Sequence, residues 1–188
     1  MKFTDAIANN PTACALMNMG ESLIMQFFER TTAMLETGQP APEFIAVNQD
    51  DETVTLAQFR DAKNVVLYFY PKDDTPGCTI EANEFTALID DFAAADTVIL
   101  GVSKDTCAKH QKFISKYGLK VELLADTEGE LCELYGTWGE RKFMGRTYMG
   151  IGRSTFVIDK QGQLVEANYK VKAKGHAEAV LEIVKGLG

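Results

Sequence analysis

The chain has 188 residues, of which 46% are hydrophobic and 24% are charged, and its net charge is −8. These values are typical of one globular domain with a sizeable core. The acidic balance argues against a surface that binds nucleic acid or an anionic membrane, because such surfaces need clustered Lys and Arg. No apolar run approaches the ~18 residues that cross a bilayer, so we expect no membrane partner.

The cysteines are widely spaced and form no Cys-x-x-Cys pair. They are Cys14, Cys78, Cys107 and Cys132. With only two histidines in the chain, the clustered ligands of a zinc site are missing, and we expect no metal. The core is large enough to need no disulfide framework, and no export signal is visible. We therefore expect reduced thiols and a cytoplasmic location.

Residues 1–33 form an extension ahead of the main domain, which is expected to cover residues 34–188. The stretch from Glu21 to Ala33 is weakly amphipathic. It lacks the apolar core of a secretory signal and is not rich in Arg. We interpret the extension as a poorly ordered tail or a mispredicted start with Met34 as the true one; a helix that docks on a partner is the third interpretation.

The remainder of the chain alternates between predicted strands and helices. In chain order the pattern predicts strands 44–47 and 53–55 as a hairpin, a helical turn 56–59, strand 65–70, helix 78–92, strand 97–103, helix 105–117 ending at Gly118, strand 122–125, helix 130–135, strands 153–158 and 163–169 as a hairpin, and helix 175–185. Strands 65–70 and 98–102 are expected to be parallel neighbours joined by a right-handed crossover. This order predicts an α/β, thioredoxin-like fold with a mixed central sheet flanked by helices.

The most informative segment surrounds Cys78. The apolar run from Val65 to Tyr70 reads as a buried strand that stops at Pro71, and a helical pattern continues from Cys78 to Phe92. A cysteine therefore stands in the first turn of a helix at the carboxyl end of a buried strand, where sites in such sheets lie. Backbone N–H groups and the helix dipole favour the thiolate there, and only the thiolate is a strong nucleophile.

These residues carry a family resemblance. Pro71, Thr75 and Cys78 match the Pro-x-x-x-Thr-x-x-Cys signature of peroxiredoxins. The longer string Tyr-Phe-Tyr-Pro-Lys-Asp-Asp-Thr-Pro-Gly-Cys-Thr resembles the peroxiredoxin Q subfamily, also called bacterioferritin comigratory proteins. The resemblance continues in residues 135–140, 148–159 and 171–176, and it covers roughly residues 34–188.

The resemblance implies a thiol-dependent peroxidase with a role in antioxidant defence and redox homeostasis. Cys78 would be the peroxidatic nucleophile, and its product a sulfenic acid. Thr75 would hydrogen-bond the sulfur and the peroxide, Arg153 would supply a fixed positive charge, and Pro71 would wall the pocket. The expected substrates are hydrogen peroxide and organic hydroperoxides, the expected reductant is thioredoxin or another thiol, and no cofactor is implied. Such proteins are often monomers.

The chain departs from the subfamily at Asn83, where many members carry a resolving cysteine. Either an external thiol reduces the sulfenic acid, or another cysteine of the same chain resolves it. Cys107 is the internal candidate, since it lies in the first turn of the helix after strand 97–103. Some relatives carry their resolving cysteine in this helix near the position of Ile114, seven residues after Cys107. A disulfide needs Cα atoms ~4.4–6.8 Å apart, so local unwinding is expected. Cys132 is expected in the core.

Two other functions compete with the peroxidase. A thiol–disulfide oxidoreductase would need Cys-x-x-Cys, whereas this chain has Thr75-Pro-Gly-Cys78. A non-catalytic thioredoxin-fold binding or holdase protein would be favoured by loss of Thr75 or Arg153, and both are present. Taken without the resemblance, several residues have ordinary interpretations: His110 on a helix surface, Trp138 in packing, and Lys172 and Lys174 in solvent.

Overall fold

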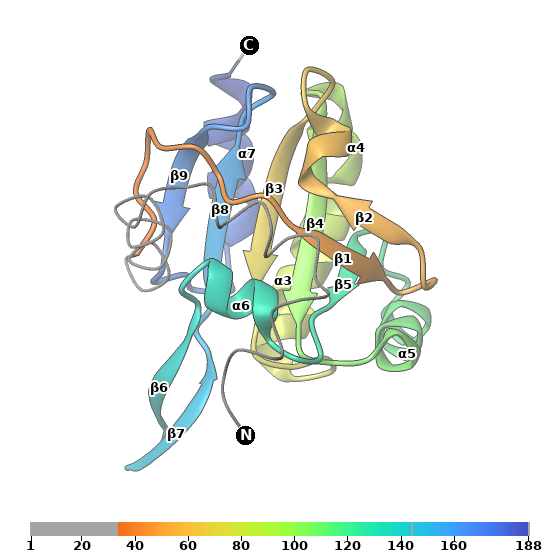
Figure 1. Ribbon diagram of the computed structural model, residues 1–188. Coiled ribbons are helices and arrows are strands. Elements are labelled where there is room, and N and C mark those ends of the chain that lie inside the picture. The colour runs from red at the N-terminus through yellow and green to blue at the C-terminus, as the bar shows by residue number, and fades with distance from the viewer. Residues whose placement is uncertain (1–33, 144, 188) are drawn as a thin grey trace, which may run out of the picture. The chain divides into compact units, whose positions relative to one another are not determined.

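The computed structural model describes residues 34–143 and 145–187 (Figure 1). The strands are β1 (Ile45–Asn48), β2 (Thr53–Thr55), β3 (Asn64–Phe69), β4 (Thr97–Ser103), β5 (Glu122–Ala125), β6 (Trp138–Phe143), β7 (Arg146–Ile151), β8 (Ser154–Ile158) and β9 (Leu164–Asn168). The helices are the 3-10 turn η1 (Leu56–Phe59) and α3 (Pro76–Ala87), α4 (Ile89–Ala94), α5 (Cys107–Tyr117), α6 (Glu130–Leu134) and α7 (His176–Lys185). The predictions for residues 1–33 and for Cys14 lie outside the described residues.

A seven-stranded mixed sheet forms the centre of the domain, in the order β2-β1-β5-β4-β3-β8-β9. β3 and β4 are parallel, with Val65 opposite Val98, and β4 and β5 are also parallel. The remaining pairs are antiparallel, including β3 with β8. The predicted α/β class, the mixed sheet and the parallel pairing of β3 with β4 are therefore confirmed.

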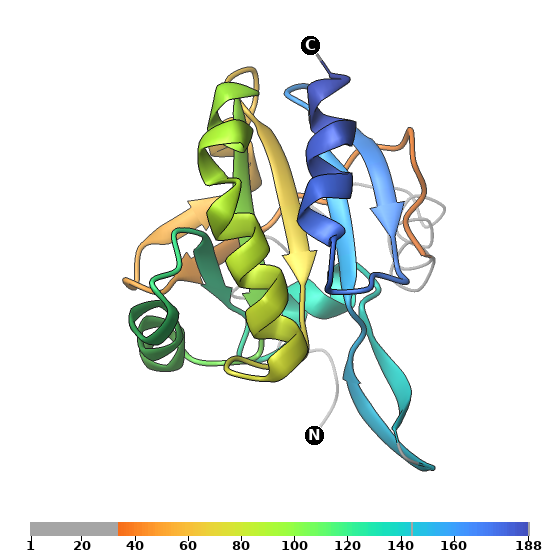
Figure 2. The ribbon, with the colours of Figure 1, turned by 180° about the vertical axis from the view of Figure 1, so that it is seen from behind.

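β3 is buried along its whole length because the sheet is covered on both faces. Its side chains alternate between two apolar clusters, as a strand requires. Val65, Leu67 and Phe69 pack with α6 on one face. Val66 and Tyr68 pack on the other face, where α3 and α7 lie side by side (Figure 2). The first turn of α3 thus packs against a strand that is buried along its whole length.

The predicted helix 78–92 is two helices, α3 and α4, separated at Leu88. Leu88 has φ −102° and ψ 10°, which interrupts the helical path. Phe85 and Phe92 are both fully buried, with ring centroids 5.8 Å apart, although seven residues of straight helix span about 10.5 Å. The break allows both rings to reach the core, and the apolar spacing alone did not reveal it. By contrast, α5 ends at Gly118 as predicted, with φ 64°.

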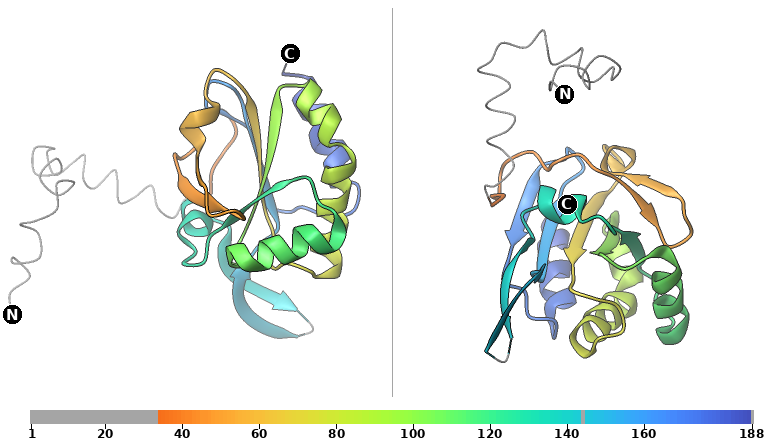
Figure 3. Two further views of the ribbon diagram at one scale, coloured as in Figure 1. Left: turned by 90° about the vertical axis from the view of Figure 1, so that its right-hand side faces the viewer. Right: turned by 60° about the horizontal axis from the view of Figure 1, so that its bottom comes forward.

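The sequence prediction missed a two-stranded antiparallel hairpin made of β6 and β7. It projects from the domain below α6 (Figures 1 and 3). Residues 146–149 of β7 are exposed and only Ile151 at its end is buried, so the strand shows no apolar alternation. The hairpin matters for the site because Arg153 follows it directly. In the part of the chain that is described, no helix combines the length and apolarity needed for a membrane span.

Candidate active site

Cys78 is the third residue of α3, at the carboxyl edge of β3. Thr75 is the N-cap residue and Pro76 opens the helix, two residues earlier than predicted. Proline suits this position because its φ is already helical and it lacks an N–H that would be left unpaired. Cys78 is only 2% exposed. The local fold therefore places the thiol at a helix start but within the packed layer.

Arg153 reaches the same point from a distant part of the chain. It stands just before β8, whose residue Ser154 lies opposite Phe69 of β3. Its Nη2 donates a hydrogen bond to Sγ of Cys78 over 3.2 Å. A Cβ at Gly77 would lie 3.3 Å from this nitrogen, so the glycine lets the guanidinium approach the helix closely. The structure thus brings together the two residues that sequence reasoning had paired.

Glu81, which sequence reasoning missed, completes this contact. Nη1 of Arg153 forms an ion pair with Oε2 of Glu81, one turn after Cys78. Glu81 is fully buried, and among the described residues its Oε1 has no hydrogen-bond partner. Burial raises the pKa of Glu81 to about 7, although the charge of Arg153 lowers it. Cys78, Glu81 and Phe85 stand at i, i+3 and i+7 on one helix face, and this spacing is the sequence signal from which Glu81 could have been found.

The same cluster raises the pKa of Arg153. Burial alone would lower it, but the negative charges of Glu81 and of Cys78 outweigh that effect. The guanidinium therefore stays charged, and one of its nitrogens remains directed at the sulfur. A fixed cation in a buried position acts on the thiolate through a low dielectric, where its effect is larger than in water.

Aromatic and neutral groups close the inner side of the site. Tyr68 packs on Phe85, with ring centroids 4.8 Å apart. Its hydroxyl is buried, and within residues 34–143 and 145–187 no group bonds to it. Burial is the main cause that raises the pKa of Tyr68, followed by the charges of Glu81 and Cys78. Burial, and then Arg153, lower the pKa of His176 to about 4, so this imidazole is neutral at pH 7.

Thr75 and Pro71, the other two predicted site residues, lie in the loop between β3 and α3. The hydroxyl of Thr75 donates to the carbonyl of Lys72 over 3.1 Å. Pro71 is exposed and follows Tyr70, whose N–H still bonds to Val102. Both residues therefore stand on the segment that leads into the helix of Cys78.

The prediction that His110 lies on a helix surface was wrong. The side chain is fully buried and bonds to Asp73, in the loop that carries Thr75. His110 and Phe113 are three residues apart in α5 and share its buried face, and that spacing was the available signal. The other ordinary interpretations are confirmed: Trp138 packs on the core, and Lys172 and Lys174 are exposed.

The other two described cysteines have different surroundings. Cys107 lies in the first turn of α5 as predicted, although the helix begins at Cys107 and not at residue 105, and it is partly buried. Its partial burial raises its pKa, and a hydrogen bond and charge interaction with Asp51 raise it further. Cys132 is fully buried, which confirms it as a core residue; burial and then Asp126 raise its pKa. All three described cysteines are free thiols.

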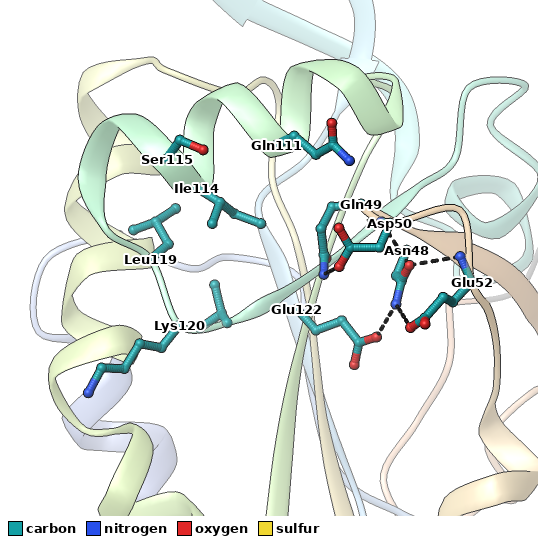
Figure 4. A pocket seen from close by; sticks show the side chains of 11 residues that line it. Asn48, Gln49, Asp50, Glu52, Gln111, Ile114, Ser115, Leu119, Lys120 and Glu122 are labelled. Carbon is teal, nitrogen blue, oxygen red and sulfur yellow. Dashed lines mark hydrogen bonds between the residues drawn. The ribbon is translucent and has the colours of Figure 1, made fainter.

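A groove of about 530 Å³ lies between α5 and the β1–β2 turn (Figure 4). Its floor is polar: the Nδ2 of Asn48 donates to Glu122 over 2.8 Å and to Glu52 over 3.3 Å. Cys78 does not line it. Within the described residues, no three His, Cys, Asp or Glu side chains are grouped to hold a metal ion.

Comparison with known proteins identifies the family. Residues 37–167 match the AhpC/TSA family. A putative peroxiredoxin Bcp from Helicobacter pylori strain J99 is 49% identical over 148 residues, which are 79% of this chain and 97% of that protein. Peroxiredoxin Bcp from Bacillus subtilis is 46% identical over 153 residues, 81% of this chain and 97% of that protein.

Solved structures agree with these relatives. The bacterioferritin comigratory protein of Xanthomonas campestris has a TM-score of 0.71 and 38% identity, over 76% of this chain and 90% of that one. A cysteine-to-serine mutant of peroxiredoxin Q from Xylella fastidiosa has a TM-score of 0.76 and 33% identity, over 82% of this chain and 98% of that one. The predicted thioredoxin-like fold and the predicted subfamily are confirmed. The chain belongs to the AhpC/TSA peroxiredoxins, in the Bcp/peroxiredoxin Q group of thiol peroxidases.

Proposed function

We propose that Cys78 is the peroxidatic nucleophile of this thiol peroxidase and reduces hydrogen peroxide and organic hydroperoxides to water and alcohols. The observation that carries the proposal is the 3.2 Å contact between Nη2 of Arg153 and Sγ of Cys78 at the start of α3. A helix N-terminus and a guanidinium together favour the anionic sulfur, which is the form that attacks a peroxide.

The reaction forms one bond and breaks one. The sulfur of Cys78 attacks one peroxide oxygen, an S–O bond forms, and the O–O bond breaks. The second oxygen leaves with the electron pair, takes a proton, and departs as water or an alcohol. Cys78 is oxidised to a sulfenic acid and the peroxide is reduced. Arg153 remains charged throughout and stabilises the negative charge that develops on the oxygens.

Thr75 and Pro71 have supporting roles in this proposal. Thr75 is the N-cap residue of the same helix, and its hydroxyl rotates from the carbonyl of Lys72 to donate to the sulfur or the peroxide. Pro71 shapes the mouth of the site at the end of β3. Residues 34–188 form the catalytic domain, and the chain works as a cytoplasmic monomer.

The range of substrates rests on a relative. The structure of the Xanthomonas campestris protein is described in terms of its alkyl peroxide reduction activity. We extend this substrate class to the present chain because the two proteins are 38% identical and share the fold with a TM-score of 0.71. The competing oxidoreductase function is disfavoured by Thr75, which stands where a dithiol would need its first cysteine.

We propose an external thiol, with thioredoxin as the protein donor, as the main reductant of the sulfenic acid. The thiol attacks the sulfur of Cys78, a mixed disulfide forms and water leaves; a second thiol then releases Cys78. The surroundings of Cys107 support this route, because its thiol faces Asp51, in the turn after β1. In the sheet, β5 and β4 separate β1, which precedes the turn of Asp51, from β3, which precedes the helix of Cys78.

Resolution by Cys107 is the alternative route. It requires the first turns of α3 and α5 to unwind before the two sulfurs meet. One equivalent of hydrogen peroxide followed by peptide mapping separates the routes. A Cys78–Cys107 disulfide that is absent in Cys107→Ser would establish the internal route. A sulfenic or thiol-adducted Cys78 in a protein whose Cys107 is still reduced would establish the external route.

The peroxidase proposal itself is tested with Cys78→Ser. The variant should consume no hydrogen peroxide above background with a thioredoxin system, because the serine hydroxyl is not a comparable nucleophile at pH 7. Cys107→Ser is the matched control, and its Cys78 should still be oxidised in a single turnover. Peroxide consumption by Cys78→Ser at the wild-type rate would overturn the assignment.

A further inference from the structure

The loop from Pro71 to Thr75 is tied to α5 through two adjacent aspartates. The carboxylate of Asp73 is buried, and its Oδ2 lies 2.8 Å from Nδ1 of His110. The hydroxyl of Tyr70 donates to its Oδ1 over 2.7 Å. Its neighbour Asp74 forms an exposed pair with Lys116 in the same helix. Figure 3 shows α5 beside the start of α3, where this loop ends.

Both ring nitrogens of His110 have hydrogen-bond partners. Its Nε2 lies 3.2 Å from the carbonyl oxygen of Leu124, which can only accept, so Nε2 carries a hydrogen. Its Nδ1 faces a carboxylate oxygen of Asp73. The imidazole therefore joins the Asp73 side chain of the loop to the backbone of β5.

The backbone of the loop is held by a second buried carboxylate. The N–H of Asp73 donates to Oδ2 of Asp105 over 2.8 Å. Burial alone would raise the pKa of Asp105, but hydrogen bonds from Asp73, Lys109 and Ser103 lower it, so this acceptor is ionised at pH 7. Asp73 is thus fixed through both its backbone and its side chain, two residues ahead of Thr75.

From these contacts we infer that His110, through Asp73, is a positioning residue for the peroxide reaction. It anchors the catalytic loop on α5 and β5, so that Thr75 and the first turn of α3 keep their positions next to Cys78. This inference rests on the proposed peroxidase function. Neither side chain touches the reacting atoms; each acts through the geometry of the loop.

Two amide variants of His110 separate this role from simple packing. In His110→Asn the amide nitrogen takes the place of Nδ1 and keeps a donor to Asp73, while the bond to Leu124 is lost. In His110→Gln the amide nitrogen takes the place of Nε2 and keeps the bond to Leu124, while the donor to Asp73 is lost. Both variants remove the ring and one hydrogen bond, and both replace it with a neutral amide; Gln is one methylene longer than Asn.

The readout is a ratio of two rate constants at Cys78 of the full chain. One is oxidation by hydrogen peroxide, and the other is alkylation by iodoacetamide, which needs a thiolate but not the loop donors. His110→Gln should lower the peroxide rate constant about tenfold while alkylation stays within twofold. His110→Asn should keep the ratio within threefold of wild type. Lys116→Gln, which breaks only the exposed pair, should leave the ratio unchanged.

Equal ratios in wild type and both His110 variants would overturn the inference and leave the peroxidase intact. Failure of the wild-type protein to react with peroxide would instead overturn the proposed function. If His110→Gln does not accumulate as folded protein, Asp73→Asn gives the same comparison, because it weakens the same contact from the loop side. A wild-type ratio in that variant would also overturn the inference.

Discussion

The starts of α3 and α5 invite comparison because the sheet places them alike. Each helix follows a strand of the parallel pair β3 and β4, and each has a cysteine in its first turn, Cys78 and Cys107. Neither N-cap side chain bonds to the helix backbone. By topology and helix dipole alone, the two thiols are equivalent.

The charged neighbours make them different. Cys78 receives a hydrogen bond from the guanidinium of Arg153, which is itself held by Glu81. Cys107 faces the carboxylate of Asp51, which raises its pKa in addition to partial burial. A helix terminus is worth roughly 0.3–1 kcal/mol at an exposed site, so a charge in direct contact decides the outcome. Both positions in the fold can hold a reactive cysteine. The charged residue next to the sulfur, Arg153 or Asp51, decides which of the two is reactive.

The largest change to this comparison is expected from Arg153→Lys. Lysine keeps the positive charge but cannot bridge Glu81 and the sulfur with one planar group. The rate constant for oxidation of Cys78 by hydrogen peroxide should fall about 100-fold, as for loss of one transition-state donor. Quenched-flow mass spectrometry of Cys78 measures it. Arg146→Lys on the exposed strand β7 is the matched control, and a rate within twofold of wild type in Arg153→Lys would contradict the assignment.

The second prediction concerns the pH dependence of stability that Glu81 creates. Its pKa rises from 4.5 in the unfolded chain to about 7 in the folded protein, so the folded state holds an extra proton between these values. Stability from this group is therefore present at low pH and is lost as pH rises through that window. At 1.36 kcal/mol per pKa unit, the loss is roughly 3 kcal/mol between pH 4 and pH 8.

Urea unfolding of wild type and Glu81→Gln across this range checks the prediction. The glutamine does not titrate, so the wild-type free energy of unfolding should fall more steeply with pH. The comparison uses slopes, so a constant loss of stability in the variant does not affect it. Parallel curves for the two proteins would show that Glu81 does not carry a raised pKa.

The smallest effect is expected at Cys107. Asp51→Asn removes the negative charge beside the thiol, so the pKa of Cys107 should fall and its alkylation by iodoacetamide at pH 8 should rise about threefold. Asparagine tolerates the left-handed backbone at this position, where φ is 60°. Peptide mapping by mass spectrometry measures the rate. Asp50→Asn is the matched control, and an equal rise in both variants would point to a general loosening of the turn.

The sequence predicted most of the fold because strong local patterns coincide with burial. The apolar run of β3, the strand β4 and the glycine that ends α5 were all found within a residue or two. The hairpin β6–β7 was missed because its second strand is exposed and carries no apolar alternation. The break at Leu88 was missed because the apolar spacing continues through it.

The site was predictable where a motif carried it and unpredictable where polar residues are buried. Cys78 and Arg153 followed from the resemblance, and the structure places them in contact. Glu81 and His110 are charged or polar by type, so composition assigns them to the surface, although their helical spacing places both on an inner face. Burial of such groups depends on partners such as Arg153 and Asp73 that are remote in sequence.

The single tryptophan of the chain gives this arrangement a further consequence. Trp138 opens β6 opposite Ile151, two residues before Arg153, and Nζ of Lys104 lies 4.7 Å from its ring centroid. Lys104 precedes Asp105 in the loop that leads into α5. Any shift of the hairpin against that loop would move a cation across the indole face and change its fluorescence. The fluorescence of Trp138 can therefore report on movements of the segment that leads to Arg153 relative to the loop that leads into α5.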